Sequence, residues 1–179
     1  MLEQLPISHK TFTNPVKRIN LGNGDSASVN TMHLMRNVIL SSAENTYVRN
    51  FAEDIIEDAE KDDYKRALAI YEYLKNHTKY THDMRSIEFI KTPPVSLQQL
   101  EVGGCPLLDC DDYTVLSLSL LSSLGYKTKM RAVAYKTQKF EHIYGMVMIK
   151  GKWVPFDLVN TAGFGKQYSP SLKYLDMEV

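Results

Sequence analysis

The sequence predicts an α+β fold in which helices come first and an antiparallel sheet follows. Apolar residues recur at helical spacing through residues 31–74, and a nearly continuous apolar run fills residues 114–124. After Gly125 apolar and polar residues alternate, which is the pattern of strands with one buried face. We therefore expect a central buried helix packed on an antiparallel sheet.

Length and charge limit the classes of function. The chain has 179 residues, of which 44% are hydrophobic, enough for one domain with a real core. Its 21 basic and 21 acidic residues cancel, which argues against binding to nucleic acid or to anionic membranes. No run reaches about 18 apolar residues, and no signal-peptide layout opens the sequence. We expect no membrane span, no signal peptide, no cofactor, and a cytoplasmic or virion-associated protein.

Three segments are expected along the chain. Residues 1–30 contain two prolines and a Gly-rich turn, and should form an extended or hairpin-forming N-terminal arm to which we assign no chemistry. Residues 31–165 should form the main domain, and residues 166–179 a C-terminal tail. Residues 78–108 should be a connector, in which Pro93-Pro94 and Gly103-Gly104 stop regular structure.

The helices before the connector are predicted from their apolar stripes. Three stripes have helical spacing and should face the core: Met32, Met35, Val38 and Ile39; Val48, Ala52, Ile55, Ile56 and Ala59; Ala67, Ile70, Tyr71 and Leu74. The methionines among them are interpreted as packing residues.

The central helix should begin beside a cysteine. Asp109 fits the N-cap position, and Asp112 completes a capping-box-like pair, so Cys110 falls in the first turn. The partial positive charge of a helix N-terminus favours a thiolate there. The neighbouring aspartates oppose this by raising the pKa of the thiol, so a nucleophilic Cys110 would need a cationic partner.

The strands offer that partner. If Lys150-Gly151 is a two-residue hairpin turn, Ile149 pairs with Lys152 and the register brings His142 and Asp157 to one face as diagonal neighbours. Cys110, His142 and Asp157 are therefore the candidate catalytic residues.

These residues carry a resemblance to a known family. Residues from about 31 to 160 resemble the transglutaminase-like superfamily, a branch of the papain-like thiol fold, and most of all its short bacterial and phage-encoded members. The matching motifs are Tyr71-Glu72-Tyr73-Leu74, Tyr80-Thr81-His82-Asp83, Glu88-Phe89-Ile90, Asp109-Cys110-Asp111-Asp112-Tyr113, Leu116 to Gly125-Tyr126, His142-Ile143-Tyr144 and Gly151-Lys152-Trp153-Val154-Pro155-Phe156-Asp157.

The resemblance implies a Cys-His-Asp triad for acyl transfer at amide bonds of a protein or peptide substrate. Cys110 would be the nucleophile, His142 the base and Asp157 the orienting acid. Water as acceptor gives a peptidase or amidase, whereas a lysine amine gives a cross-linker. Family members usually have Gly directly before the Asp-Cys pair, and animal transglutaminases have an upstream tryptophan. Here Cys105-Pro106-Leu107-Leu108 separates Gly103-Gly104 from Asp109, which should reshape the rim of the pocket. The only tryptophan is Trp153, after His142, which argues against cross-linking of the animal type, and a peptidase or amidase is favoured.

Two other classes of function stay open. The fold could serve structurally in a phage virion or scaffold, with other virion proteins as partners, or it could transfer an acyl group from a small-molecule donor. For single residues, Cys105 is interpreted as a loop thiol, Asp111 and Asp112 as cap charges, and Tyr80 as a candidate pocket wall. Neither a zinc site nor a calcium loop is expected, because the ligand sets are incomplete.

Overall fold

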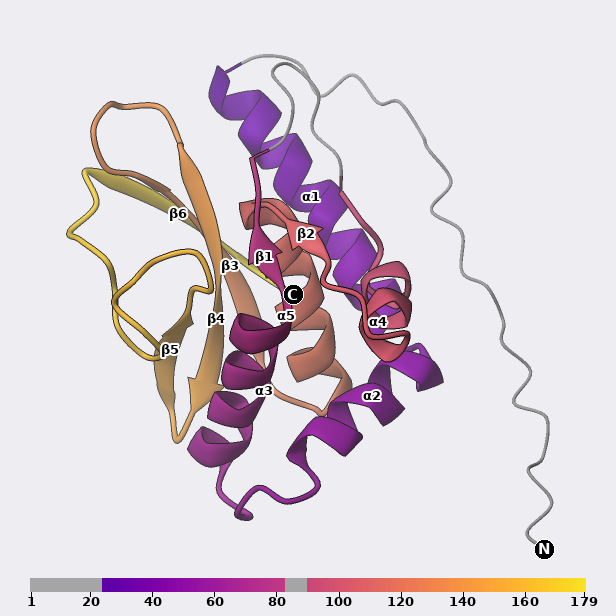
Figure 1. The fold of residues 1–179 in the computed structure, drawn as a ribbon. Coiled ribbons are helices and arrows are strands. Elements are labelled where there is room, and N and C mark those ends of the chain that lie inside the picture. Colours follow the sequence, from indigo (N-terminus) through magenta and orange to yellow (C-terminus); the bar gives the residue numbers. More distant parts are fainter. Residues whose placement is uncertain (1–23, 83–89) are drawn as a thin grey trace, which may run out of the picture.

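The computed structural model describes residues 24–82 and 90–179. Its helices pack on one face of a four-stranded antiparallel sheet, so the predicted α+β fold is confirmed (Figure 1). The helices are α1 (Gly24–Ala43), α2 (Thr46–Ile56), α3 (Asp63–His77), α4 (Pro93–Glu101) and α5 (Cys110–Ser123). The strands are β1 (Lys79–Tyr80), β2 (Leu107–Leu108), β3 (Thr128–Ala134), β4 (His142–Ile149), β5 (Lys152–Phe156) and β6 (Lys173–Glu178).

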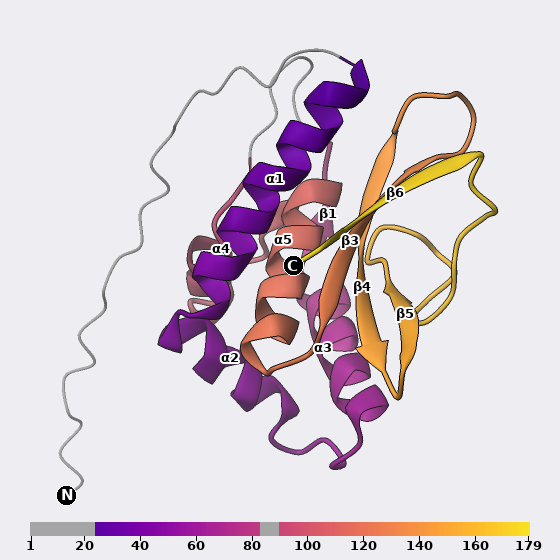
Figure 2. The same cartoon turned by 180° about the vertical axis from the view of Figure 1, so that it is seen from behind.

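Helix α5 is the centre of the fold. It lies between the sheet and the other helices, with contacts to α1, α2 and α3 on one side and to β4 on the other (Figure 2). Its apolar residues therefore point in all directions and are buried all round: Val115, Leu116, Leu118, Leu120 and Leu121. A helix that is hydrophobic on every side is stable only in such a position. The residue that begins α5 is accordingly fixed by contacts on several sides.

The sheet has the strand order β5-β4-β3-β6. Ile149 pairs with Lys152 across the β4–β5 turn, which is the predicted register. His142 is the first residue of β4, and Asp157 follows directly after the last residue of β5. The start of β4 and the end of β5 therefore lie side by side at the open end of the hairpin, opposite its turn.

Gly145 allows β4 to lie close to α5. A Cβ atom at this position would be 2.6 Å from Cδ2 of Leu118 and 3.1 Å from its Cγ. Contacts of this length are too short for carbon atoms, and the Leu118 side chain is fully buried. The absence of a side chain thus sets the distance between the helix that begins at Cys110 and the strand that begins at His142.

The expectation that Pro93-Pro94 stops regular structure is wrong, because the two prolines begin α4. Proline is well suited to the first helical turn, where its missing N–H has no helical partner to lose. The remainder of the connector contains the short parallel pair β1–β2, in which Tyr80 lies opposite Leu108.

Two expected segment boundaries differ from the structure. Helix α1 already begins at Gly24, so the boundary between residues 30 and 31 falls inside it, and residues 1–23 of the expected arm lie outside the described residues. Residues 166–179, expected as a tail, contain β6, which pairs with β3 along its whole length. An edge strand with only two inward apolar residues, Leu175 and Met177, gives a weak sequence signal.

Candidate active site

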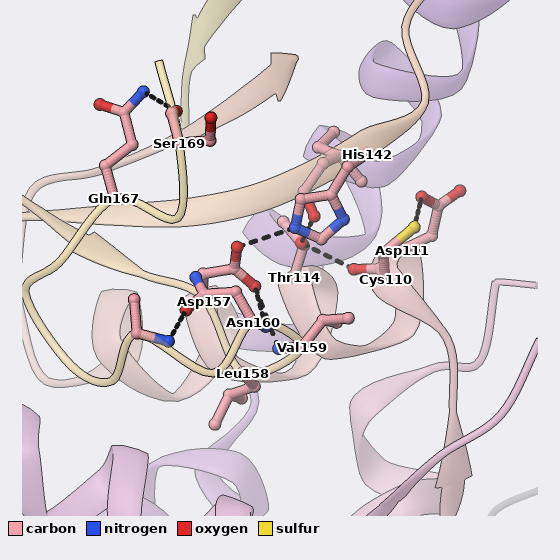
Figure 3. Close-up of polar contacts among 12 residues, drawn as sticks. Cys110, Asp111, Thr114, His142, Asp157, Leu158, Val159, Asn160, Gln167 and Ser169 are labelled. Carbon is pink, nitrogen blue, oxygen red and sulfur yellow. Dashed lines mark hydrogen bonds and ion pairs between the residues drawn. The ribbon is translucent and has the colours of Figure 1, made fainter. Parts of the chain in front are cut away.

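Cys110 is the first residue of α5, as the capping pattern predicted. The side chain of Asp109 is the N-cap and accepts a 2.9 Å hydrogen bond from the N–H of Asp112. The Thr114 hydroxyl donates to the Cys110 carbonyl oxygen at 2.8 Å and also reaches the Ile143 carbonyl oxygen on β4 at 3.3 Å. The cysteine backbone is therefore held both by its helix and by the neighbouring strand (Figure 3).

The thiol of Cys110 rests in its protonated form. Burial raises its pKa well above the ordinary value, and the negative charges of Asp111 and Asp109 raise it further. The backbone N–H of Ile143 faces the sulfur and opposes this effect only in part. The thiol donates to Oδ1 of Asp111 at 3.5 Å. Activation of this sulfur thus requires a group that accepts its proton.

His142 is placed to be that group. Its Nε2 lies 2.8 Å from Oδ2 of Asp157, which confirms that the hairpin register brings these two side chains together. A carboxylate only accepts, so Nε2 carries the proton and Nδ1 keeps a lone pair. Figure 3 shows the imidazole between Asp157 and the Cys110 sulfur, with its second nitrogen on the cysteine side.

Asp157 is buried at the end of β5, with 2% of its surface exposed. Its Oδ1 accepts from the backbone N–H of Val159 at 3.0 Å and of Asn160 at 3.3 Å. Burial alone would raise the pKa of Asp157, but the hydrogen bond from His142, together with these N–H donors, holds it below the ordinary value. The side chain is thus an ionised acceptor for the imidazole.

Helix α3 supports the turn that carries Asp157. The Tyr71 hydroxyl donates to the Asp157 carbonyl oxygen at 3.3 Å, and the Lys75 ammonium donates to the Leu158 carbonyl oxygen at 2.6 Å. Sequence reasoning placed Tyr71 in a core stripe and in a motif of the resemblance, without a contact to Asp157, and did not single out Lys75. A lysine in a helical segment has no pattern that could have indicated a partner 83 residues away.

Two tyrosine rings lie near the His142 imidazole and nearly parallel to it. The Tyr135 ring lies 6.5 Å from the His142 ring at an angle of 27°, and the Tyr144 ring lies 5.8 Å from it at 25°. Tyr144 belongs to the same strand as His142, two residues on, so its position follows from the alternation of side chains. The imidazole that donates to Asp157 thus has two nearly parallel aromatic neighbours.

Asp112 has a partner that the sequence did not indicate. Its Oδ1 accepts from the N–H of Lys91 at 2.7 Å and its Oδ2 from the Lys91 ammonium, also at 2.7 Å. The same ammonium donates to the Leu107 carbonyl oxygen at 2.8 Å. Asp112, interpreted above as a cap charge, thus fixes the segment before α4 and strand β2 to the first turn of α5.

A cavity of ≈ 190 Å³ opens beside the sulfur and the imidazole. Its walls come from α1, from the residues that precede β4, and from Asp111. Cys105 is exposed. Tyr80 is 41% exposed, and burial together with the negative charges of Asp109 and Asp111 raises its pKa to about 12, so it lies near the site. The motif residues Asp83, Glu88 and Phe89 lie outside the described residues.

A central helix that begins with a cysteine, packed on a sheet that carries a histidine and aspartate pair, defines the papain-like class of thiol folds. Within that class, the sequence model of the transglutaminase-like superfamily matches residues 49–158, more than half of the chain. The chain therefore belongs to the transglutaminase-like superfamily.

Two solved structures are similar in fold. A candidate protease from Parabacteroides distasonis has a TM-score of 0.59 at 9% identity, over 75% of this chain and 26% of that protein. A candidate cysteine protease from Cytophaga hutchinsonii has a TM-score of 0.51 at 16% identity, over 78% of this chain and 50% of that protein. This chain thus spans half or less of either protein, and the likeness is one of fold.

No protein of curated function matches the sequence at a significant level. Among residues 24–82 and 90–179, no helix combines the length and the apolar character needed to cross a lipid bilayer.

Proposed function

We propose that this protein is a cysteine hydrolase or acyltransferase that acts on amide bonds through Cys110, His142 and Asp157. One observation carries the proposal: the 2.8 Å hydrogen bond from His142 to Asp157 fixes the imidazole with its free nitrogen toward Cys110. A buried carboxylate, an imidazole and a thiol in this order form the arrangement of nucleophile, base and orienting acid used in acyl transfer.

The reaction begins with proton transfer. Nδ1 of His142 accepts the thiol proton as the Cys110 sulfur attacks the carbonyl carbon, and the carbonyl π electrons move to the oxygen. The backbone N–H of Cys110, at the positive end of α5, provides part of the oxyanion hole. When the tetrahedral intermediate collapses, the C–N bond breaks and the imidazolium gives its proton to the leaving nitrogen. Asp157 stabilises the imidazolium throughout and keeps its own charge.

Water is the favoured acyl acceptor. In the second step His142 removes a proton from water, the hydroxide attacks the thioester, and the acid product and the thiol are released. This gives a peptidase or amidase. An amine in place of water would give a cross-linker by the same proton transfers, so the acceptor has to be determined by measurement.

Labelling and hydrolysis together test the proposal. The protein is treated at pH 7.5 with a chloroacetamide that carries a short uncharged peptide amide, and the adduct is located by mass spectrometry. We expect the adduct on Cys110 and its loss in Cys110→Ser. Cys105→Ser is the matched control and should keep it. An adduct on Cys105 alone would show that the nucleophile is wrongly assigned.

The same variants are then incubated with denatured casein. New amino termini, measured with fluorescamine, indicate a peptidase. Released ammonia indicates attack on side-chain amides, by an amidase if the casein chains stay separate and by a cross-linker if they become joined. Loss of both products in Cys110→Ser and in His142→Ala would support the triad. Absence of any product, together with absence of an adduct on Cys110, would contradict catalysis and favour the structural role in a virion or scaffold.

A further inference from the structure

A cavity of ≈ 290 Å³, the distal pocket, lies at the opposite end of α5 from Cys110. It is bordered by the end of α2, the first turn of α3, and the turn that joins α5 to β3 (Figure 2). Because a helix rises about 1.5 Å per residue, the 14 residues of α5 put about 20 Å between this pocket and Cys110. The distal pocket is thus separate from the candidate active site.

One part of the distal pocket is apolar. Ile56 from α2, Leu124 from the turn after α5 and Met148 from β4 line it, and each is half-buried. The Tyr126 ring also lines it, and its hydroxyl donates to the Asp63 carbonyl oxygen at 3.1 Å. An apolar group seated in the pocket would remove more of these side chains from water, which is favourable.

Arg66, in the first turn of α3, brings an uncompensated charge to the pocket. Its Nε is shut off from solvent, and among the described residues no atom accepts its hydrogen. Only Nε is enclosed in this way, so the two Nη nitrogens stay accessible. The guanidinium forms no ion pair with a carboxylate of the described residues. A buried charged donor without an acceptor is costly, so this side chain lacks the anion that such a group normally has.

The other charges around the pocket leave it positive. Lys127 lines it as a second cation, and Asp63 is the one carboxylate among its described lining residues. Both are exposed. The neighbouring Asp62 carboxylate is already bound to the Lys150 ammonium at 2.8 Å. Two cations thus face one exposed carboxylate, and the excess of one positive charge matches a ligand with a single negative charge.

We propose that the distal pocket binds a small carboxylic acid, with its carboxylate on the Nη groups of Arg66 and its apolar body against Ile56, Leu124 and Met148. The planar guanidinium offers a carboxylate two parallel N–H donors, and Lys127 adds a second cation. The volume suits a body of about the size of a leucine side chain. This inference goes beyond the proposed function and does not depend on it.

A titration followed by ¹H–¹⁵N NMR spectra tests the proposal with the full chain at pH 7 and low salt. The probe is 4-methylpentanoate. Its amide, 4-methylpentanamide, has the same shape without the charge, and inorganic phosphate has charge without the apolar body. We expect the acid to shift the Arg66 Nε–H signal and the Gly125 and Lys127 amide signals, and to bind at least about tenfold more tightly than either control.

Variants locate the charge that holds the acid. Arg66→Gln should weaken binding of the acid about tenfold, and Lys127→Gln severalfold. Lys65→Gln, which removes the adjacent exposed lysine of α3 outside the pocket lining, is the matched control and should bind as wild type does. Cys110→Ser should also bind as wild type does. The comparison of acid with amide in wild type is decisive even if Arg66→Gln folds poorly.

A peptide distinguishes two sources of the same group. N-acetyl-Gly-Gly-Leu presents a carboxylate and a leucine body at a chain end. Binding as tight as that of 4-methylpentanoate would support the proposal with a protein C-terminus as ligand, and binding of the free acid alone would support it with a small acid as ligand.

Equal affinities for the acid and its amide, or acid binding that Arg66→Gln leaves unchanged, would overturn the inference. Shifts confined to the Cys110 and His142 amides would also overturn it, because they would place the acid in the candidate active site. None of these results depends on labelling of Cys110 by the amide probe, so failure of the proposed function and failure of this inference are distinguishable.

Discussion

The Lys75 ammonium on α3 donates a 2.6 Å hydrogen bond to the carbonyl oxygen of Leu158, the residue that follows Asp157. This contact joins the third helix to the turn after β5, 83 residues further along the chain. The Lys75 ammonium therefore holds the backbone next to Asp157, the residue whose carboxylate orients His142. The position of the Asp157 carboxylate thus depends on α3 as well as on the sheet.

Lys75→Met should therefore loosen the Asp157 turn while leaving α3 intact, because methionine keeps the helix propensity and most of the stem. We expect a loss of about 1 kcal/mol in the free energy of unfolding and a several-fold slower reaction of Cys110 with the amide probe. Lys75→Arg should restore the labelling rate. Lys65→Met, which removes only an exposed pair with Glu60, is the control. Equal behaviour of the two methionine variants would contradict a positioning role for Lys75.

Asp157→Asn tests whether the carboxylate orients His142. The amide oxygen can still accept from the Val159 and Asn160 N–H groups, so the fold should be kept. Its NH₂ group would, however, meet Nε2 and favour the tautomer with a proton on the side of Cys110. We expect turnover to fall by about four orders of magnitude, as in other triads. Superimposable pH profiles of thiol labelling in wild type and variant would mean that Asp157 has no part in activating Cys110.

Asp157→Ala should in addition reduce stability, because the backbone N–H groups of Val159 and Asn160 would lose their acceptor. We expect a decrease of about 1–3 kcal/mol in the free energy of unfolding, measured in urea. Asn should not show this decrease, and that difference separates the orienting role from the structural one.

The reactivity of Cys110 toward a small neutral reagent should rise steeply with pH. Its pKa is raised by burial and by Asp111 and Asp109, so alkylation by iodoacetamide in the Cys105→Ser background should increase about tenfold per pH unit from pH 7 to 9. Asp111→Asn removes one of these charges and should shift the profile to lower pH. Asp58→Asn, at an exposed position in the turn after α2, should not shift it. A plateau below pH 8 in wild type would contradict a raised pKa.

The same raised pKa predicts a stability change with a definite sign. Between the thiol pKa of the unfolded chain, about 8.5, and the higher pKa of the folded chain, the folded state binds more protons at Cys110 than the unfolded state does. The contribution of this group is complete below pH 8.5 and is lost as the pH rises. Urea unfolding at pH 7.5 and 9.5 should therefore show a smaller alkaline loss for Cys110→Ala than for wild type.

Gly145→Ala should separate β4 from α5. The new methyl group would overlap Leu118, so we expect a loss of about 1–3 kcal/mol and slower labelling of Cys110. Leu118→Ala makes room for that methyl group. In the Leu118→Ala background the added cost of Gly145→Ala should nearly vanish, and a cost that stays the same in both backgrounds would show that the contact with Leu118 is not its cause.

Local patterns explain what could be predicted from the sequence. The N-cap at Asp109 and the Lys150-Gly151 turn involve residues that are neighbours in the chain, so residue type and spacing identify them. The turn then fixes the register, and the register brings the start of β4, with His142, beside the end of β5, where Asp157 follows. The proximity of the candidate pair thus follows from one short hairpin.

The missed features depend on contacts between distant segments. Lys75 and Lys91 are surface-type residues in sequence, and only the folded chain brings them to Leu158 and Asp112. Helix α4 was missed because a proline pair was interpreted as an end of regular structure when it is also a good beginning. The lining of the cavity was missed because it combines residues that are far apart in the chain, from α1 and from the segment before β4.

The protonated state of Cys110 has a consequence for oxidative damage. Peroxides attack thiolates and react slowly with thiols, and oxidation beyond the sulfenic acid is not reversed by simple thiols. Burial and the two aspartates therefore shield the sulfur from peroxide by the same effect that slows its alkylation. The exposed Cys105 has no comparable cover. Under oxidative stress the loop thiol would be modified first, and the sulfur at the start of α5 would remain reduced.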